Sequence, residues 1–256
     1  MASPSPNFKI LEQLAELARA LANAHRLHLL QHLAQGERSV ERLAELTHMT
    51  IGNASQHLQQ LRRSGFVSVQ RDGKNMIYKL ADGPIVDLLT ALRRLGESNN
   101  AEVRMIIADY FDRLDALEPV GRDGLVRRVK EGDVVLLDVR PEDEYESGHL
   151  PGALNLLPEE LEKRISELPH DQEIVAYCRG AYCVASFEVV ATLRDRGYKI
   201  RRLEEGFPEW KAAGLTIETG RRAPATVNAR ADVRRSKQPR RAAASKKSVR
   251  GRKGKN

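Results

Sequence analysis

The first part of the chain places apolar residues at the spacing of helices. From Asn7 to Leu33 they recur every three or four positions, which predicts two amphipathic helices, and Gly36 is suited to end the second. Ser39 and Thr50 are typical N-cap residues and predict two further helices. Gly65 marks the end of the last one. Four helices are therefore expected before Gly65.

The spacing then changes to that of strands. Residues 66–71 and 75–80 alternate in strand fashion around the turn Asp72-Gly73-Lys74, which predicts a β-hairpin. Helices, a helix-turn-helix and a hairpin in this order make a winged helix. In such a fold the second helix of the turn enters the major groove of DNA, and the hairpin reaches the backbone or minor groove.

Two more amphipathic runs follow, Ile85–Leu95 and Val103–Leu117, and Pro119 with Gly121 marks a domain junction. Beyond the junction short apolar runs alternate with helical ones. The strands are expected at Val134–Val139, Ile174–Tyr177 and Lys199–Leu203, and the helices at Glu159–Leu168 and Val184–Arg196. This alternation predicts an α/β domain whose parallel sheet has helices on both faces.

The strand that ends at Tyr177 runs directly into Cys178, a short loop and a helix. Backbone amides of the loop can converge on the Cys178 sulfur, and the helix N-terminus adds a positive dipole; both favour a thiolate. The alternative is a buried cysteine that only fills space. The residues of this predicted anion-binding loop are Arg179, Gly180, Ala181, Tyr182 and Cys183.

Three further segments surround this cysteine in the sequence: Asp138-Val-Arg140, Gly148-His149-Leu-Pro-Gly-Ala and Gly206-Phe-Pro-Glu-Trp210. With Cys178 they resemble the rhodanese (sulfurtransferase) domain over roughly residues 119–218. The resemblance implies that a Cys178 thiolate attacks a sulfane donor such as thiosulfate and forms a persulfide, with Arg179 attracting the anionic donor. Asp138, Arg140 and His149 are expected to form a framework of hydrogen bonds and ion pairs around the site.

The loop departs from the common rhodanese pattern at two places. Ala181 stands where a glycine is usual, and Cys183 stands where a cation or hydroxyl is usual. The lost cation argues against efficient thiosulfate turnover. Cys183 is either a resolving thiol that closes a disulfide or polysulfide with Cys178, or an inert residue of the following helix.

The first domain resembles winged-helix repressors of the arsenical-resistance (ArsR) type, over roughly residues 8–118. The resemblance is carried by the segments 21–30, 39–46 and 54–67, with Ser-Gln-His-Leu at 55–58 as the most specific piece. It implies a homodimer, paired through the helices after residue 84, that reads an inverted repeat in double-stranded DNA. His57 has the alternative of a structural role within the helix. The residues expected to contact DNA bases or phosphates are Thr50, Asn53, Ser55, Gln56, His57, Arg62, Arg63, Arg71 and Lys74.

Many ArsR-type proteins sense metals through cysteines or through Asp/His pairs, and neither set is present at the corresponding helices here. His25, His28 and His32 share a helical face, but no fourth ligand accompanies them. They are expected to be surface or dimer-contact residues. The prediction is therefore no metal site and no cofactor.

Charge separates the end of the chain from the rest. Residues 221–256 hold 14 Lys and Arg against one Asp and are rich in Ala and Ser. They are expected to form a disordered basic tail, either a solubility segment or a source of salt-dependent DNA affinity. The predicted organisation is a winged helix at 1–83, dimerisation helices and linker at 84–118, a rhodanese domain at 119–220 and the tail at 221–256.

The chain has two cysteines, no apolar signal segment and no run long enough to span a bilayer, so a cytoplasmic protein without membrane contact is expected. Two functions remain open. The first is a transcriptional regulator, expected to be a repressor, that senses sulfane sulfur or redox state through Cys178 and Cys183. The second is an active sulfurtransferase that the winged helix only localises. Binding of an oxyanion by the loop without sulfur transfer is a third alternative.

Overall fold

The structure, a computed structural model, describes residues 5–115 and 119–220 of the 256-residue chain. Four helices begin it, each capped by a side chain that accepts a backbone N–H three residues on: Ser5, Asn23, Ser39 and Thr50. The expected caps Ser39 and Thr50 are confirmed. The helices are α1 (Pro6–Leu21), α2 (Ala24–Gln35), α3 (Val40–Leu46) and α4 (Ile51–Arg63).

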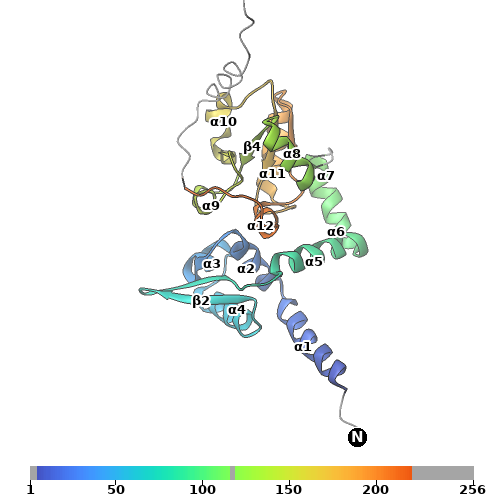
Figure 1. The fold of residues 1–256 in the computed structure, drawn as a ribbon, viewed down its shortest axis with the longest axis vertical. Helices are drawn as coiled ribbons and strands as arrows, with labels where there is room; N and C mark the ends of the chain where they lie inside the picture. The colour runs from blue at the N-terminus through green and yellow to red at the C-terminus, as the bar shows by residue number, and fades with distance from the viewer. Residues whose placement is uncertain (1–4, 116–118, 221–256) are drawn as a thin grey trace, which may run out of the picture. The chain divides into compact units, whose positions relative to one another are not determined.

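A three-stranded antiparallel sheet completes the winged helix (Figure 1). Strands β2 (Val67–Asp72) and β3 (Asn75–Leu80) form the predicted hairpin. Gly73 in its turn has a φ of +58°, a backbone conformation that glycine adopts without steric cost. The short strand β1 (Arg38–Ser39), which the apolar pattern did not predict, pairs with β3 and ties the start of α3 to the base of the wing.

The core of the winged helix joins α2, α3 and α4. Leu29, Leu30 and Leu33 of α2 are buried with Leu58 and Leu61 of α4. Beside this core, the buried Arg26 side chain donates to the Ala20 and Arg19 carbonyls at the end of α1 and to Gln60 of α4. Helices α2 and α4 are therefore held together by apolar packing and by a partly buried hydrogen bond.

The next helical run leads from the winged helix to the second sheet. It consists of α5 (Ile85–Asn99), α6 (Ala101–Ile106), a π-helical turn η1 (Ile107–Phe111) and α7 (Asp112–Leu114). The Phe111 ring packs against Phe187, and Asp115 pairs with Arg194 at 2.9 Å. These contacts anchor the end of the run.

The second sheet is parallel, with strand order β5-β4-β6-β7, and the rhodanese-type α/β fold is confirmed. Val134, Leu136 and Val175 face α8, α9 and α12, whereas Leu137 and Ile174 face α10 and α11. Apolar side chains thus cover both faces, as buried parallel strands require. The elements are α8 (Arg122–Glu131), β4 (Val134–Asp138), α9 (Glu142–Ser147), β5 (Leu154–Asn155), η2 (Pro158–Glu160), α10 (Leu161–Arg164), η3 (Ile165–Glu167), β6 (Glu173–Tyr177), α11 (Val184–Asp195), β7 (Ile200–Arg202) and α12 (Phe207–Ala212).

One expected helix is shorter than predicted. The run Glu159–Leu168 divides into two 3-10 turns with α10 between them. Arg164 at the break has φ −117° and ψ 7°, which leaves the α-helical conformation. Leu161 and Leu168 are nevertheless buried on the sheet, so the apolar pattern indicated the packing but not the helix length.

The predicted basic tail, 221–256, lies outside the described residues. Within the described ranges, no helix has the length and apolar character needed to cross a bilayer.

Candidate functional site

Cys178 lies where two neighbouring parallel strands end. Asp138 of β4 pairs in register with Tyr177 of β6, so the residues after each strand meet at one edge of the sheet. This is the edge at which open α/β sheets bind ligands. Cys178 is only 3% exposed and belongs to the apolar cluster under α11.

The structure shows Cys178 and Cys183 joined by a disulfide, with Cα atoms 6.1 Å apart. The four residues between them form a closed loop that leads into α11. The Cys183 amide donates to the Gly180 carbonyl at 3.3 Å, so it is used within the loop and does not serve the expected anion cradle. In this state both sulfurs are engaged with each other, and a thiolate requires that the disulfide be reduced.

The Arg179 side chain is neutralised by a buried carboxylate. Its guanidinium donates to both oxygens of Glu144 at 2.8–3.0 Å, and Glu144 is 2% exposed. Arg38, from β1 of the winged helix, lies 3.8 Å from the same carboxylate and 3.6 Å from Asp143. Arg179 is therefore tied to α9, which weakens the role expected for it in attracting an anionic donor.

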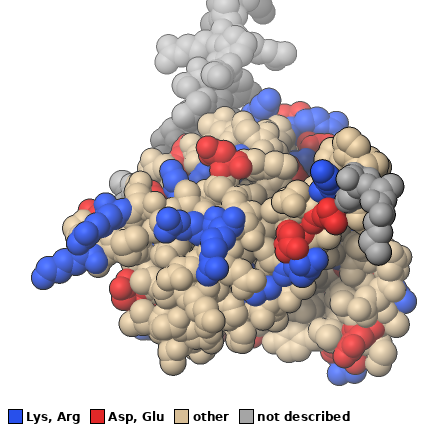
Figure 2. Space-filling model, turned by 90° about the horizontal axis from the view of Figure 1, so that it is seen from below, with Lys and Arg blue, Asp and Glu red and all other residues tan. Residues whose placement is uncertain are grey.

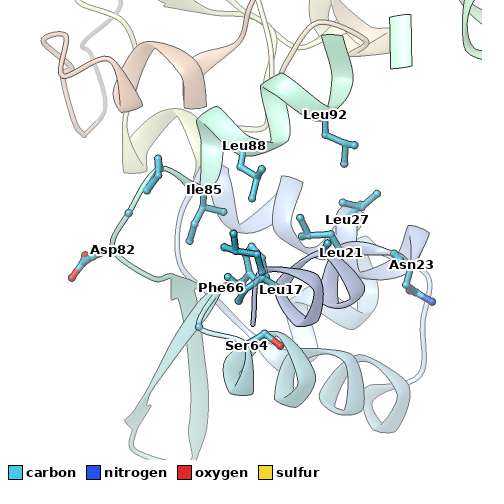
Figure 3. A pocket seen from close by; sticks show the side chains of 16 residues that line it. Leu17, Leu21, Asn23, Leu27, Ser64, Phe66, Asp82, Ile85, Leu88 and Leu92 are labelled. Carbon is cyan, nitrogen blue, oxygen red and sulfur yellow. The ribbon is translucent and has the colours of Figure 1, made fainter. Parts of the chain in front are cut away.

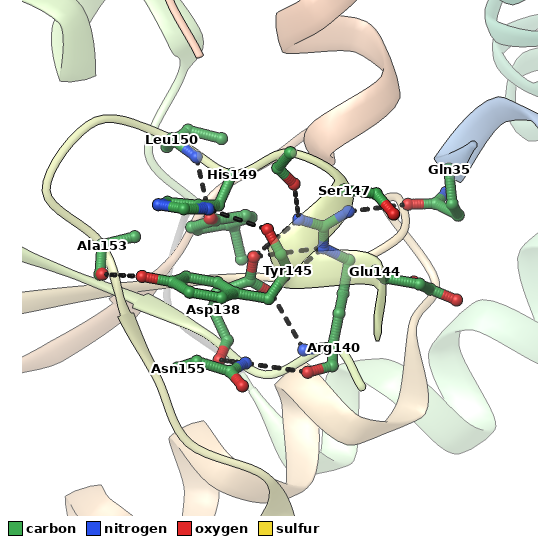
Figure 4. Close-up of polar contacts among 12 residues, drawn as sticks. Gln35, Asp138, Arg140, Glu144, Tyr145, Ser147, His149, Leu150, Ala153 and Asn155 are labelled. Carbon is green, nitrogen blue, oxygen red and sulfur yellow. Dashed lines mark hydrogen bonds and ion pairs between the residues drawn. The ribbon is translucent and has the colours of Figure 1, made fainter. Parts of the chain in front are cut away.

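Asp138 and Arg140 form a fully buried ion pair at the end of β4 (Figure 4). The Arg140 guanidinium donates to Asp138 at 2.7 Å and to the Gly148 carbonyl at 2.7 Å, and it lies 4.1 Å from the centre of the Phe207 ring. Burial by itself lowers the pKa of Arg140, but the Asp138 carboxylate outweighs it, so the pKa is raised and the guanidinium stays charged. The ion pair therefore keeps both charges fixed at the sheet edge where Cys178 lies.

His149 is held by Tyr145 and Glu218. Its Nδ1 is 2.8 Å from the Tyr145 carbonyl, which can only accept, so Nδ1 carries the proton. The imidazole stacks on the Tyr145 ring at 3.7 Å, and Nε2 is 3.7 Å from Glu218. The structure thus places His149 among supporting contacts, as Figure 4 shows.

A residue of the winged helix reaches this site. Gln35, the last residue of α2, is 2% exposed. Its Oε1 accepts from Arg140 at 3.3 Å, the contact drawn in Figure 4. Its Nε2 donates to the Arg179 carbonyl at 3.1 Å. Both polar atoms of the Gln35 amide are therefore bound to residues around Cys178.

A second contact links the loop to α5. The Tyr182 hydroxyl donates to Glu97 at 2.5 Å, and Glu97 also pairs with Arg93 at 2.6 Å. Burial, followed by the Glu97 hydrogen bond, raises the pKa of Tyr182, so the phenol keeps its proton. The loop between the cysteines thus contacts two helices of the N-terminal part.

Gly206 is a close packing partner of the same loop. A Cβ at this position would lie 2.4 Å from the Gly180 nitrogen and 2.7 Å from the Cys178 carbonyl oxygen. The Phe207 amide donates to that carbonyl at 3.0 Å. Only a glycine fits here without moving the loop.

One face of the α4 helix is exposed. Ala54, Leu58 and Leu61 are buried at helical spacing, which directs Gln56 and Arg63 to the opposite, exposed side. The Thr50 hydroxyl accepts a hydrogen bond from the Asn53 amide and so caps the helix. Asn53, Arg62, Arg71 and Lys74 are exposed and Ser55 is half-buried. Figure 2 shows Lys and Arg side chains along the protruding hairpin and on the adjoining face.

Each histidine of α2 lies beside another histidine: His25 beside His57 of α4, and His28 beside His32. The His57 ring lies 5.7 Å from His25, so it is turned toward α2 and is half-buried. His28 and His32 approach with their Nε2 atoms 3.2 Å apart. Among the described residues, no group of three or more His, Cys, Asp and Glu side chains is placed to hold a metal ion.

A large apolar cavity of about 780 Å³ lies between α1, α5 and the end of α4 (Figure 3). Leu14, Leu17, Leu88 and Leu92 line it and remain 41–53% exposed. Ala20 is the one fully buried apolar residue of the described α1, so the apolar stripe of this helix faces outward rather than into the core.

Reasoning from the sequence missed several residues at the cysteine site. Glu144 lies between two of the segments that resemble rhodanese, and its position four residues after Arg140 was a usable signal. Gln35, Arg38 and Glu97 come from the first domain, and no pattern in the sequence connects them with Cys178.

Two family models match the chain: the rhodanese-like domain over residues 122–213, and the bacterial regulatory protein, arsR family, over residues 23–69. The fold and these matches define a helix-turn-helix regulator joined to a rhodanese-like domain. A curated relative, the HTH-type transcriptional regulator Rv0324 of Mycobacterium tuberculosis, is 41% identical over 211 residues, which is 82% of this chain and 92% of the relative. The chain therefore belongs to the ArsR-type transcriptional regulators that carry a C-terminal rhodanese-like domain.

Other relatives match single parts. A sulfurtransferase of Allochromatium vinosum is 36% identical over 86 residues, covering 33% of this chain and 78% of that protein. Among solved structures, the homodimeric winged helix-turn-helix domain (fragment 1–100) of Mb0332 from Mycobacterium bovis is 35% identical and covers 40% of this chain and 95% of that one, with a TM-score of 0.36.

Proposed function

We propose that this regulator senses sulfane sulfur through Cys178 and Cys183 and changes its affinity for operator DNA in response. The observation that carries the proposal is the disulfide itself: the two cysteines of the chain meet at the ligand-binding edge of the sheet. The loop they close contacts both α2 and α5 of the N-terminal part. A change at the sulfurs therefore has a short physical route toward the DNA-binding helices.

The chemistry has two balanced steps. The Cys178 thiolate attacks the outer sulfur of a persulfide or polysulfide donor, RSSH; a new S–S bond forms, the donor's S–S bond breaks, and RS⁻ leaves. The Cys183 thiolate then attacks Sγ of the Cys178 persulfide and releases HS⁻. Two thiols have been oxidised, and the sulfane sulfur has been reduced to hydrosulfide.

Catalytic turnover of thiosulfate is the second candidate, and the match to the rhodanese-like domain favours it. The site argues against efficient turnover. Arg179 is paired with Glu144, and Cys183 occupies the place where a cation or hydroxyl is usual. We expect thiosulfate:cyanide turnover near background. Rapid turnover that Cys178→Ala abolishes would favour the sulfurtransferase over the sensor.

The regulator is expected to act as a homodimer on an inverted repeat. The support is the apolar surface around the cavity: exposed leucines of α1 and α5 lie together and would be covered by the same surface of a second copy. The sequence had assigned pairing to the helices of residues 84–118. The exposed stripe of α1 extends the proposed interface to the start of the chain.

The proposal is tested by treating the reduced protein with a polysulfide and following intact mass together with binding to DNA from its own promoter region. We expect added sulfur on Cys178, or loss of two hydrogen atoms as the disulfide closes, in step with a change in DNA affinity. Cys178→Ser should bind DNA with an affinity that the polysulfide does not change. Sulfur loading with unchanged affinity would contradict the sensor.

A further inference from the structure

Gln35 belongs by sequence to the DNA-binding domain, but its side chain completes the polar shell of the rhodanese site. Its Oε1 accepts from Arg140, whose guanidinium is fully buried. Its Nε2 donates to the carbonyl of Arg179, the residue that directly follows Cys178. The same Nε2 also donates, at 3.4 Å, to the Gln31 carbonyl within α2, so the amide nitrogen joins α2 to the loop. The buried Oε1 stays satisfied only while Arg140 stays in place.

The backbone of Gln35 is fixed to the winged helix. Leu33, two residues earlier, is buried in the core with α4, and Arg26 at the other end of α2 donates to Gln60 of α4 at 2.8 Å. A displacement at the C-terminal end of α2 is therefore passed to α4, the helix expected in the major groove, because both pack as one close-packed unit.

The acceptor of Gln35 lies within the loop that the cysteines close. Arg179 is the first of the four residues between Cys178 and Cys183, and Gly206 packs against its backbone. Opening or closing the disulfide changes the constraint on this loop. The Arg179 carbonyl is thus the point at which a change at sulfur meets a residue of the winged helix.

We propose that Gln35 is a positioning residue of the cysteine site, and that its bond to the Arg179 carbonyl transmits the state of Cys178 and Cys183 to α2 and α4. This inference rests on the proposed sensing function. It assigns the coupling to one side chain, whose hydrogen bonds with Arg140 and with the Arg179 carbonyl can be separated by mutation.

Two variants separate the contributions of the hydrogen bonds with Arg140 and with the Arg179 carbonyl. Gln35→Leu removes every hydrogen bond of the side chain and introduces an apolar side chain of similar size. Gln35→Glu retains an acceptor for Arg140 but has no donor for the Arg179 carbonyl. Gln31→Leu, one turn earlier on the exposed side of α2, is the matched control. Thermal melts followed by circular dichroism verify folding, and Gln35→Glu carries the test if Gln35→Leu does not fold.

Each full-length protein is measured in the reduced and the disulfide form. The first readout is the ratio of promoter-DNA dissociation constants between the two forms. The second is the rate at which iodoacetamide alkylates Cys178 in the reduced form without DNA, located by peptide mass mapping. We expect wild type and Gln31→Leu to show a ratio of at least about tenfold. Both Gln35 variants should lower it below about threefold while their disulfide still forms, and should speed alkylation several-fold.

An unchanged affinity ratio in both Gln35 variants would overturn the proposed route, and a full ratio in Gln35→Glu alone would overturn the role of the Arg179 carbonyl. If wild type itself binds DNA equally in both forms, the sensing function fails. The alkylation rates then test the role of Gln35 separately. Faster alkylation of Cys178 in the Gln35 variants than in wild type would support Gln35 as a positioning residue of the cysteine site, and an unchanged rate would show that it is not one.

Discussion

Gly206 shows how a single residue sets the shape of the cysteine loop. Its missing side chain lets the segment before α12 lie against Cys178, Arg179 and Gly180. The sequence marked this glycine only as part of a motif that resembles rhodanese. Its physical reason is close backbone approach, which apolar periodicity does not register.

We expect Gly206→Ala to displace the loop. The added methyl would overlap backbone atoms that have little freedom to move, so the free energy of unfolding should fall by about 1–3 kcal/mol. Alkylation of reduced Cys178 should change with it. Gly124→Ala, in α8 with no atom near the added Cβ, is the control and should be neutral or stabilising by up to about 1 kcal/mol. Equal urea midpoints for wild type and Gly206→Ala would refute this packing account.

His32 provides a pH-dependent contribution to stability. Burial, then the positive neighbours His28 and Arg179, lowers its pKa from 6.5 to about 4. The folded state therefore keeps His32 neutral, whereas the unfolded chain binds a proton below pH 6.5. The stability it contributes is present above pH 6.5 and is lost as the pH falls toward 4.

The measurement is the free energy of unfolding in urea between pH 7 and pH 4. Wild type should lose up to about 3 kcal/mol more than His32→Leu across this interval, because that variant has no proton to bind. His170→Leu, which removes an exposed histidine, is the matched control and should follow wild type. Parallel pH curves for wild type and His32→Leu would show that His32 is not held neutral.

Helices α1 and α5 carry apolar stripes that the described chain leaves exposed. Leu88 and Leu92 are 45% and 41% exposed beside the cavity. Burial of such side chains stabilises by roughly 25 cal/mol per Å² of apolar surface. The periodicity predicted these helices correctly, but a single chain does not reveal which apolar face packs inside and which packs against a second copy.

We expect the double variant Leu88→Glu, Leu92→Glu to shift a dimer to monomers, since it places four carboxylates in the paired interface. Sedimentation equilibrium measures the change, which should exceed about a hundredfold in the dimer dissociation constant. Met76→Glu, on the exposed wing, is the control with the same charge change per site. A double variant that stays dimeric would place the interface elsewhere.

The sequence anticipated the larger elements of both domains well. Caps such as Ser39 and Thr50, and the apolar runs of β4 and β6, are local signals that the structure confirms. The loop's polar partners were not predictable. Gln35 lies 144 positions from Arg179, and a hydrogen bond over that separation follows from tertiary packing rather than from any local pattern.

Charge along the whole chain points to a second, sequence-independent mode of DNA binding. Residues 221–256 carry 14 cations and one anion, whereas residues 119–220 are net acidic. Each Lys or Arg that neutralises a phosphate releases counterions and steepens the salt dependence of binding.

Removal of residues 221–256 should therefore weaken binding to unrelated DNA and reduce the slope of log K against log salt by several units. The measurement is a salt series by fluorescence anisotropy, with the full chain and the truncated chain on the same duplex. The ratio of operator affinities between reduced and disulfide forms should survive truncation. An unchanged slope would assign the tail to solubility instead.

A sensor of sulfane sulfur must bind its operator differently when the state of Cys178 and Cys183 changes. The decisive experiment titrates a labelled promoter duplex with the reduced protein and with the polysulfide-treated protein, side by side with Cys178→Ser. We expect dissociation constants that differ at least about tenfold in wild type and coincide in Cys178→Ser. Equal constants in wild type, with the disulfide verified by mass, would contradict the sensing function and leave two independent domains on one chain.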